Sequence, residues 1–197
     1  ARINRIFEGT NEINRMLAVG QILKKAMKGK IDLMGPAMKI QDELMEIPDF
    51  EYEQDEVLYQ ERKSVVQAKK AILMLAGAAA KKYMLELENK QEILMNLADM
   101  LIQVFTAEST VLRTGKLVNK SGVESHEREI NITKCYVNEA MEKTYLSGKY
   151  LLAELAEDDM LVMMHMGLKR FTKYPILNTI SLKKKIASVL IEKNTFY

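Results

Sequence analysis

The chain contains few of the residues that end helices or cross-link a protein. Its 197 residues include 3 Pro, 9 Gly, one Cys and no Trp. With so few helix-breaking residues, the turns should be few and the secondary-structure elements long. The single cysteine, Cys135, excludes a disulfide within the chain and is consistent with a reducing compartment. We expect it to be a small buried apolar residue in the middle of a helix.

An excess of one charge and a long apolar run are also missing. The 29 Lys and Arg residues nearly balance the 27 Asp and Glu residues, and the net charge of +2 does not indicate nucleic acid as a partner. No apolar run reaches the roughly 20 residues of a membrane span, and the first residues do not have the form of a signal peptide. His126 and His165 have no further ligand at a suitable spacing, so we expect no metal site.

The residues that are abundant favour helices. Apolar residues make up 48% of the chain and charged residues 28%, as in ordinary globular proteins. Ala, Leu, Lys, Glu and Met dominate, and no stretch alternates with a period of two, so we expect no sheet. Apolar residues recur instead at three- and four-residue spacing. Helices are therefore predicted over residues 10–28, about 30–45, 55–87, 89–117, 125–145, 150–171 (one or two shorter helices) and 180–193.

Long helices joined by short loops predict an all-α fold, an up-and-down antiparallel bundle. Asn89 and Ser125 are placed to cap helices, Pro48 should end the second helix before an acidic linker, and Ser147-Gly148 should form a corner. The small residues of the run 76–80 should let another helix approach closely. Two apolar stripes should face the core: Val65, Ala68, Ile72, Leu75, Ala76, Ala79 and Tyr83, and Leu94, Leu97, Ala98, Leu101, Val104, Phe105, Glu108 and Leu112.

One short stretch near the start combines groups that could perform chemistry. It reads Arg5-Ile6-Phe7-Glu8-Gly9-Thr10-Asn11-Glu12-Ile13-Asn14-Arg15. Taken alone, it is best interpreted as a glycine turn followed by Thr10 or Asn11 capping a helix. The alternative is a base, Glu8, held at the mouth of a helix whose free N–H groups and positive dipole end face a bound ligand.

The whole string from Ala1 to Arg15 resembles the signature of the flavin-dependent acyl-CoA dehydrogenases, R-I-[FY]-E-G-T-x-[EQD]-I-x-R. The resemblance implies that Glu8 is the catalytic base that removes the α-proton of a fatty acyl-CoA while hydride leaves Cβ for the flavin. It also implies that Gly9 lets the substrate approach, and that Thr10, Asn11 and Glu12 touch FAD. A base of this kind needs a desolvated site and hydrogen bonds to the thioester carbonyl.

The chain continues for about 170 residues beyond this signature, which resembles the helical C-terminal extension of the very-long-chain branch. The expected organisation is the end of the catalytic domain with its leftover N-terminal helix (residues 1–28), an amphipathic linker (29–56) and a helical-bundle extension (57–197). Because the sequence begins at Ala1, inside the motif, we expect a processed product or a cut fragment, the latter more than the former.

The resemblance also implies the activity of a parent protein. That parent would convert long-chain acyl-CoA to trans-2-enoyl-CoA in fatty acid β-oxidation, pass electrons from FAD to an electron-transferring flavoprotein, and form a homodimer. The glycine-rich segment and the other flavin-holding domains are absent from the sequence. We therefore expect the fragment to be inactive and free of FAD, with residues 7–10 frayed or packed non-natively and the next helix kept only by docking on the bundle. A non-enzymatic helical interaction or assembly module is the alternative.

Residues 24–45 have a basic amphipathic composition that suits a membrane surface. The extension of the very-long-chain branch is associated with membrane attachment, but a linker helix packed on the parent's own core explains the composition equally well. The localisation expected is cytoplasmic or peripheral membrane in a bacterium, and mitochondrial matrix or inner membrane in a eukaryote. Two further groups are assigned to structure: Lys183, Lys184 and Lys185 as a solvated helix face, and Met160, Met163, Met164 and Met166 as a core or interface stripe, favoured over an acyl groove.

Overall fold

The computed structural model describes residues 2–45 and 56–194, and over this part of the chain it is helical without strands. The predicted all-α class is therefore confirmed. The α-helices are α1 (Asn11–Met27), α2 (Met34–Met45), α3 (Tyr59–Tyr83), α4 (Gln91–Ser121), α5 (Glu127–Leu155), α6 (Asp158–Phe171) and α7 (Thr179–Lys193). Short 3-10 helices η1 (Arg2–Arg5), η2 (Met84–Asn89) and η3 (Glu124–His126) connect or precede them.

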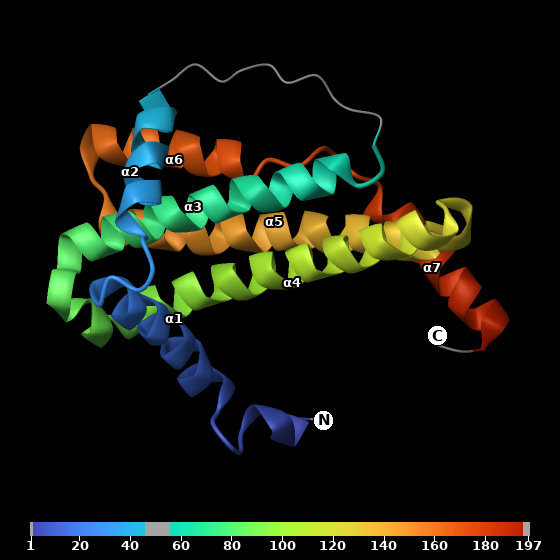
Figure 1. The fold of residues 1–197 in the computed structure, drawn as a ribbon, viewed down its shortest axis with the longest axis horizontal. Coiled ribbons are helices and arrows are strands. Elements are labelled where there is room, and N and C mark those ends of the chain that lie inside the picture. The colour runs from blue at the N-terminus through green and yellow to red at the C-terminus, as the bar shows by residue number, and fades with distance from the viewer. Residues whose placement is uncertain (1, 46–55, 195–197) are drawn as a thin grey trace.

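Three long helices, α3, α4 and α5, lie side by side at the centre of an up-and-down bundle, with α4 antiparallel to the other two (Figure 1). On the outside, α1 packs on α4, α2 and α6 pack on α3, and α7 packs on α5. Small residues of α3 lie at the centre of the bundle, where Ala68, Ala71 and Ala79 are completely buried. They allow the neighbouring helices to approach closely. Within the predicted run of small residues, a Cβ on Gly77 would lie 3.0 Å from the Cβ of Ala37, so α2 makes such an approach.

The predicted corner at Ser147-Gly148 is wrong, because α5 continues through both residues to Leu155. Gly148 is buried where α6 crosses α5. A Cβ at this position would lie 2.7 Å from Leu168 Cδ1 and 3.3 Å from Leu75 Cδ1. Both leucines are completely buried and have no empty space to move into. The glycine therefore permits close helix packing rather than a turn.

We expect Gly148→Ala to lower the free energy of unfolding by about 1–3 kcal/mol, because the added methyl overpacks the contact with Leu168. Denaturant unfolding followed by circular dichroism would measure it. Gly20→Ala is the matched control: nothing lies within 4 Å of a Cβ at Gly20, so the higher helix propensity of alanine should stabilise the chain by up to about 1 kcal/mol. Equal effects of the two substitutions would contradict the packing role of Gly148.

Several predicted helix ends differ from the structure. Asn89 is not a cap, because it ends η2 and α4 starts after Lys90, whose side chain makes no capping hydrogen bond. Ser125 lies inside η3, and α5 starts after His126. The helix α4 continues past the predicted end at about residue 117 to Ser121, and α2 starts at Met34 rather than at about residue 30. Of the predicted acidic linker, only Glu56 lies within the described residues, where its Oε1 pairs with Arg62 at 2.7 Å.

Candidate functional site

The candidate base lies in the N-terminal arm, which we define as residues 2–10. After η1 the backbone takes left-handed conformations at Glu8 (φ 57°) and Gly9 (φ 98°), and this reversal leads directly into α1. Asn14 Nδ2 donates a hydrogen bond of 2.8 Å to the Gly9 carbonyl oxygen. Thr10 Oγ1 accepts one of 3.3 Å from the N–H of Ile13, which confirms Thr10 as the helix cap. The segment is therefore bonded locally rather than frayed.

Gly9 is required by this geometry for two reasons. Its φ of 98° lies in the region that L side chains rarely adopt. A Cβ would also lie 2.9 Å from Asn14 Oδ1, so it would push away the side chain that holds the turn. Any other residue at this position would therefore both strain the backbone and displace Asn14.

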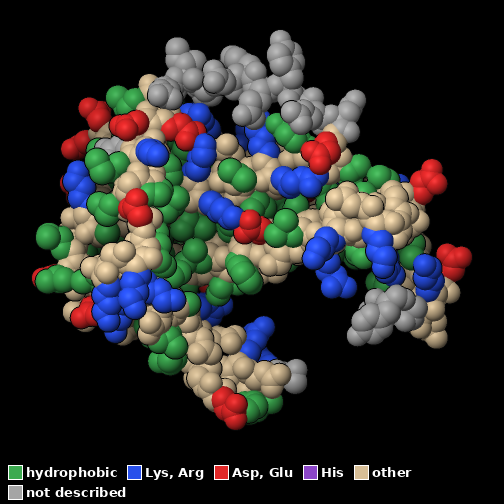
Figure 2. Space-filling model, in the orientation of Figure 1, with side chains coloured by type: hydrophobic (Ala, Val, Ile, Leu, Met, Phe, Trp, Pro, Cys, Tyr) green, Lys and Arg blue, Asp and Glu red, His purple; other side chains and the backbone are tan. Residues whose placement is uncertain are grey.

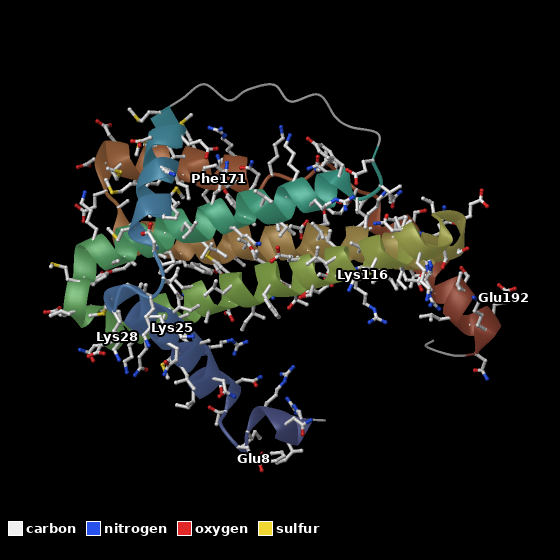
Figure 3. The ribbon with its side chains drawn as sticks, viewed as in Figure 1. Glu8, Lys25, Lys28, Lys116, Phe171 and Glu192 are labelled. Atoms are coloured by element: carbon white, nitrogen blue, oxygen red, sulfur yellow. The ribbon has the colours of Figure 1, made fainter. Side chains whose placement is uncertain are left out.

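Glu8 itself is exposed, and its carboxylate forms no hydrogen bond or ion pair with any described residue. Figure 3 places it at the bend between η1 and α1, away from the bundle. The structure thus brings Glu8, Gly9 and Thr10 together in one turn, with Asn11 and Glu12 in the first turn of α1. Nothing in the described part of the chain encloses this turn, so the desolvation that a catalytic base requires is not supplied by the bundle.

The arm is positioned by the docking of α1 on α4. Arg15 Nε lies 2.7 Å from Asp99 Oδ1 of α4, and Val19 is buried at 3% exposure. The outward face of the same helix leaves Ile13 and Leu17 more than half exposed, at 53% and 55%. The helix after the motif is thus retained because it docks on the bundle, which was the condition expected for it.

The two histidines and the cysteine have structural surroundings. His165 Nε2 lies 3.1 Å from the hydroxyl of Tyr145, and His126 lies beside Glu129. The described residues contain no group of His, Cys, Asp and Glu side chains that could hold a metal ion. Cys135 is buried as predicted, and burial raises the pKa of its thiol, so the reactive thiolate is disfavoured.

The methionine stripe and the lysine run divide between core and surface. Met164 is buried and Met163 packs against the core, whereas Met160 and Met166 are exposed at 43% and 68%. The lysines of α7 lie on a solvated face as predicted. There Lys183 Nζ pairs with Glu139 of α5 at 2.5 Å, and Lys185 Nζ lies 3.8 Å from Glu127.

Sequence reasoning missed a groove between α1, the loop after it, α3, η2 and the start of α4, which we call the α1 groove. Its volume is about 920 Å³, and its lining is mostly apolar. Lysine side chains gather over the C-terminal end of α1 beside it (Figure 2), where Figure 3 labels Lys25 and Lys28. The clue available in the sequence was the apolar excess of residues 16–34, but the opposite wall comes from α3 and η2, about fifty residues later.

A buried carboxylate was also missed. Glu61 is only 3% exposed, and its Oε1 accepts a hydrogen bond of 2.5 Å from the hydroxyl of Tyr174. Burial, together with this carboxylate, raises the pKa of Tyr174. The pair ties the segment between α6 and α7 to the first turn of α3. Its contribution is to the fold, since it faces neither the arm nor the α1 groove.

Residues 67–170, from α3 to α6, match the family model described as "Acyl-CoA dehydrogenase, C-terminal domain". The chain belongs to the acyl-CoA dehydrogenase family. This match excludes the arm and α1, so it is independent of the motif that first indicated the family. The family resemblance is therefore confirmed, while membership of the very-long-chain branch stays a prediction.

Two bacterial acyl-CoA dehydrogenases match the whole chain. It is 40% identical over 196 residues to a probable acyl-CoA dehydrogenase of Bacillus subtilis (strain 168), covering 100% of this chain and 33% of the relative. The crystal structure of an acyl-CoA dehydrogenase complexed with FAD from Bacillus anthracis superposes with a TM-score of 0.95 at 41% identity, over 100% of this chain and 33% of that one. The chain thus spans about a third of the length of these relatives.

Proposed function

We propose that the chain is the C-terminal third of an FAD-dependent acyl-CoA dehydrogenase that converts long-chain acyl-CoA to trans-2-enoyl-CoA, with Glu8 as the base. The observation that carries the proposal is the Glu8-Gly9 turn at the mouth of α1, in a chain that aligns from end to end with one third of a relative solved with FAD. The role in β-oxidation, transfer of electrons to an electron-transferring flavoprotein and homodimer formation belong to the same proposal.

The chemistry assigned to the arm is proton abstraction. The Cα–H bond of the thioester breaks, the proton goes to the Glu8 carboxylate, and a Cα–Cβ double bond forms as hydride leaves Cβ. The backbone N–H of Glu8 donates to the thioester carbonyl and so increases the acidity of the α-proton. Gly9 carries no side chain of its own beside the base, and its φ of 98° gives the turn a shape that few other residues could adopt.

The start of α1 suits an anionic dinucleotide. The N–H groups of Asn11 and Glu12 donate to no described residue, whereas that of Ile13 is already used by Thr10. Free N–H groups and the positive end of the helix dipole favour phosphate at such a position. Thr10, Asn11 and Glu12 are therefore the residues that would contact FAD, which supplies the hydride acceptor when bound.

A comparison of the full-length protein with the 197-residue chain tests this function. In the full-length protein, anaerobic addition of palmitoyl-CoA should bleach the flavin absorption band, and butyryl-CoA should do so far more slowly. The 197-residue chain, in which Glu8 is exposed, should carry no flavin and oxidise no acyl-CoA. Absence of bleaching with every acyl-CoA would favour the alternative, a non-enzymatic interaction or assembly module. Flavin bound to the short chain would contradict the expected inactivity of the fragment.

A second role, contact with a membrane surface through residues 24–45, is favoured by the exposed side chains there. Met27, Met34, Met38 and Met45 are 56–76% exposed. The acidic residues that weaken this interpretation are partly engaged in the fold. Asp32 accepts from the N–H of Gly35, and Glu43 pairs with Lys70 and Arg170. Such contact would place the protein at the cytoplasmic membrane of a bacterium or the inner membrane of a mitochondrion. None of the described helices is long and apolar enough to cross a bilayer.

Flotation with anionic liposomes checks this second role. We expect the chain to float at low salt, and the triple substitution of Lys24, Lys25 and Lys28 by Glu to reduce the floating fraction at least fivefold. Each cation near an anionic surface contributes about 1 kcal/mol. The same triple substitution at Lys183, Lys184 and Lys185 is a control with an equal change in net charge. No flotation of the unaltered chain would exclude the membrane role.

A further inference from the structure

The α1 groove has the size and lining of a site for a small apolar ligand. Its volume of about 920 Å³ lies within the range of roughly 300–1,000 Å³ typical of small-molecule sites. Its inner part is formed by leucines of α1, α3, η2 and α4 together with small residues that leave the space open. These lining residues are Leu23, Leu73, Leu87 and Leu94, and Gly20, Ala76, Gly77 and Ala80.

The outer walls are apolar, flexible and exposed. Four methionines line them, Met16, Met27, Met34 and Met84, and methionine adapts its shape to an irregular ligand better than branched residues do. Met27, Met84 and Leu85 are each 70–76% exposed. Apolar side chains gathered in this way around an open groove mark a surface that gains from being covered.

One end of the groove, at Lys24, suits a ligand with a single compact negative charge. Lys24 lines the groove, Lys25 and Lys28 follow on the same end of α1, and no described residue forms an ion pair with any of the three. Asp32 and Glu88 also line it. The two carboxylates outnumber the one lining lysine and would repel a head group with several phosphates. A single carboxylate can instead pair with Lys24 alone, since Asp32 is already engaged by the N–H of Gly35. We propose that the α1 groove binds a free long-chain fatty acid, with its tail among the leucines and methionines and its carboxylate at Lys24.

This site is distinct from the turn that carries the base. Gly20 lies nine residues beyond Asn11 on the same helix, about 14 Å along the axis at 1.5 Å per residue. The proposal therefore does not rest on the role of Glu8, and its failure would leave the proposed dehydrogenase activity untouched.

Gly20→Leu tests whether the groove is the site. No atom lies within 4 Å of a Cβ at Gly20, so a leucine can project into the groove without displacing the fold. The probe is cis-parinaric acid, titrated into the 197-residue chain and followed by its fluorescence. We expect saturable binding of one molecule per chain, and a loss of affinity of at least tenfold in Gly20→Leu. The matched control is Gly115→Leu on α4, where the nearest atom to a Cβ is Arg62 Nη1 at 3.7 Å; it should bind within twofold of the unaltered chain.

The head group is tested by calorimetric titration with dodecanoate and dodecanol below their micellar concentrations. Lys24→Glu combined with Lys28→Glu should weaken dodecanoate about tenfold and leave dodecanol within twofold. The tail is tested by chain length. Each buried methylene adds about 0.8 kcal/mol to the binding free energy, so decanoate, which is two methylenes shorter, should bind more weakly than dodecanoate by about tenfold or more. Far-ultraviolet circular dichroism verifies that each variant is folded.

Three outcomes would overturn the proposal. The first is no saturable binding of the probe, or an equal loss of affinity for the probe in Gly20→Leu and Gly115→Leu. The second is binding of anionic vesicles without binding of monomeric fatty acid, which would assign the groove to a bilayer. The third is a dimer in size-exclusion chromatography that Gly20→Leu converts to monomer while the probe remains unbound, which would assign the groove to a second copy of the chain.

Discussion

Replacing Glu8 by Gln in the full-length protein should lower kcat for acyl-CoA oxidation by a factor of about 10²–10⁴, the usual contribution of a positioned general base. Glutamine has nearly the same shape as glutamate, but its amide cannot accept the α-proton. Glu8 forms no hydrogen bond with a described residue, so the substitution leaves the turn at Gly9 and the Thr10 cap intact. The loss should therefore appear in the chemical step and not in protein stability.

Stopped-flow reduction of the bound flavin by acyl-CoA measures this step directly. Glu192→Gln is the matched control, because Glu192 is exposed on α7, far from the arm (Figure 3). It should reduce flavin at the unaltered rate. A Glu8→Gln protein that keeps its flavin and loses less than tenfold in rate would show that another group is the base.

Among single substitutions, Phe171→Ala should destabilise the chain most, lowering its free energy of unfolding by about 3–5 kcal/mol. Phe171 ends α6, is completely buried, and its ring lies beneath Lys70 Nζ at 6.0 Å and the Arg170 guanidinium at 5.7 Å. Removal of the ring leaves a cavity in the core and also removes both cation contacts. The midpoint of urea unfolding should shift strongly, and the melting temperature should fall by roughly 2–4 °C for each kcal/mol.

Phe105→Ala is the matched control, because the same atoms are removed from a ring that is 72% exposed on α4. It should change the free energy of unfolding by less than about 0.5 kcal/mol. Phe171→Leu retains most of the buried volume and provides a folded variant for measurement if Phe171→Ala does not fold. Equal decreases in the free energy of unfolding for the Phe171 and Phe105 variants would contradict the difference in burial between the two rings.

Helix number and order could be predicted because helix-breaking residues are rare and the apolar spacing is regular. The exact use of each glycine could not. Gly148 and Gly29 each stand in a polar stretch that could form a turn. Gly148 nevertheless lies inside α5 at a helix contact, whereas Gly29 follows the end of α1. The sequence also could not show which residues at the edges of an apolar stripe would be buried. Spacing places Phe105 and Leu112 beside Val104 and Leu101, but they lie past the edge of the contact and are 72% and 61% exposed.

The candidate base could be located from fifteen consecutive residues, because a turn and its cap are local structures. The α1 groove could not be predicted, because its walls come from residues 16–34 and 73–94. These residues are brought together only when α1 packs on α4 and α4 packs on α3. No other exposed glutamate lies in a comparable motif, so the motif alone singled out Glu8 as the candidate base. The groove could be found only from the three-dimensional structure.

The docking of α1, held chiefly by Arg15, Asp99 and Val19, also determines how cooperatively this end of the molecule folds. Segments with few buried contacts open at a lower free energy than the core to which they are attached. With one buried apolar residue in its 17, α1 can detach and re-dock while α3, α4 and α5 stay folded. Detachment would displace Glu8 and dismantle one wall of the α1 groove in the same event, so a ligand in the groove would hold α1 in place by mass action.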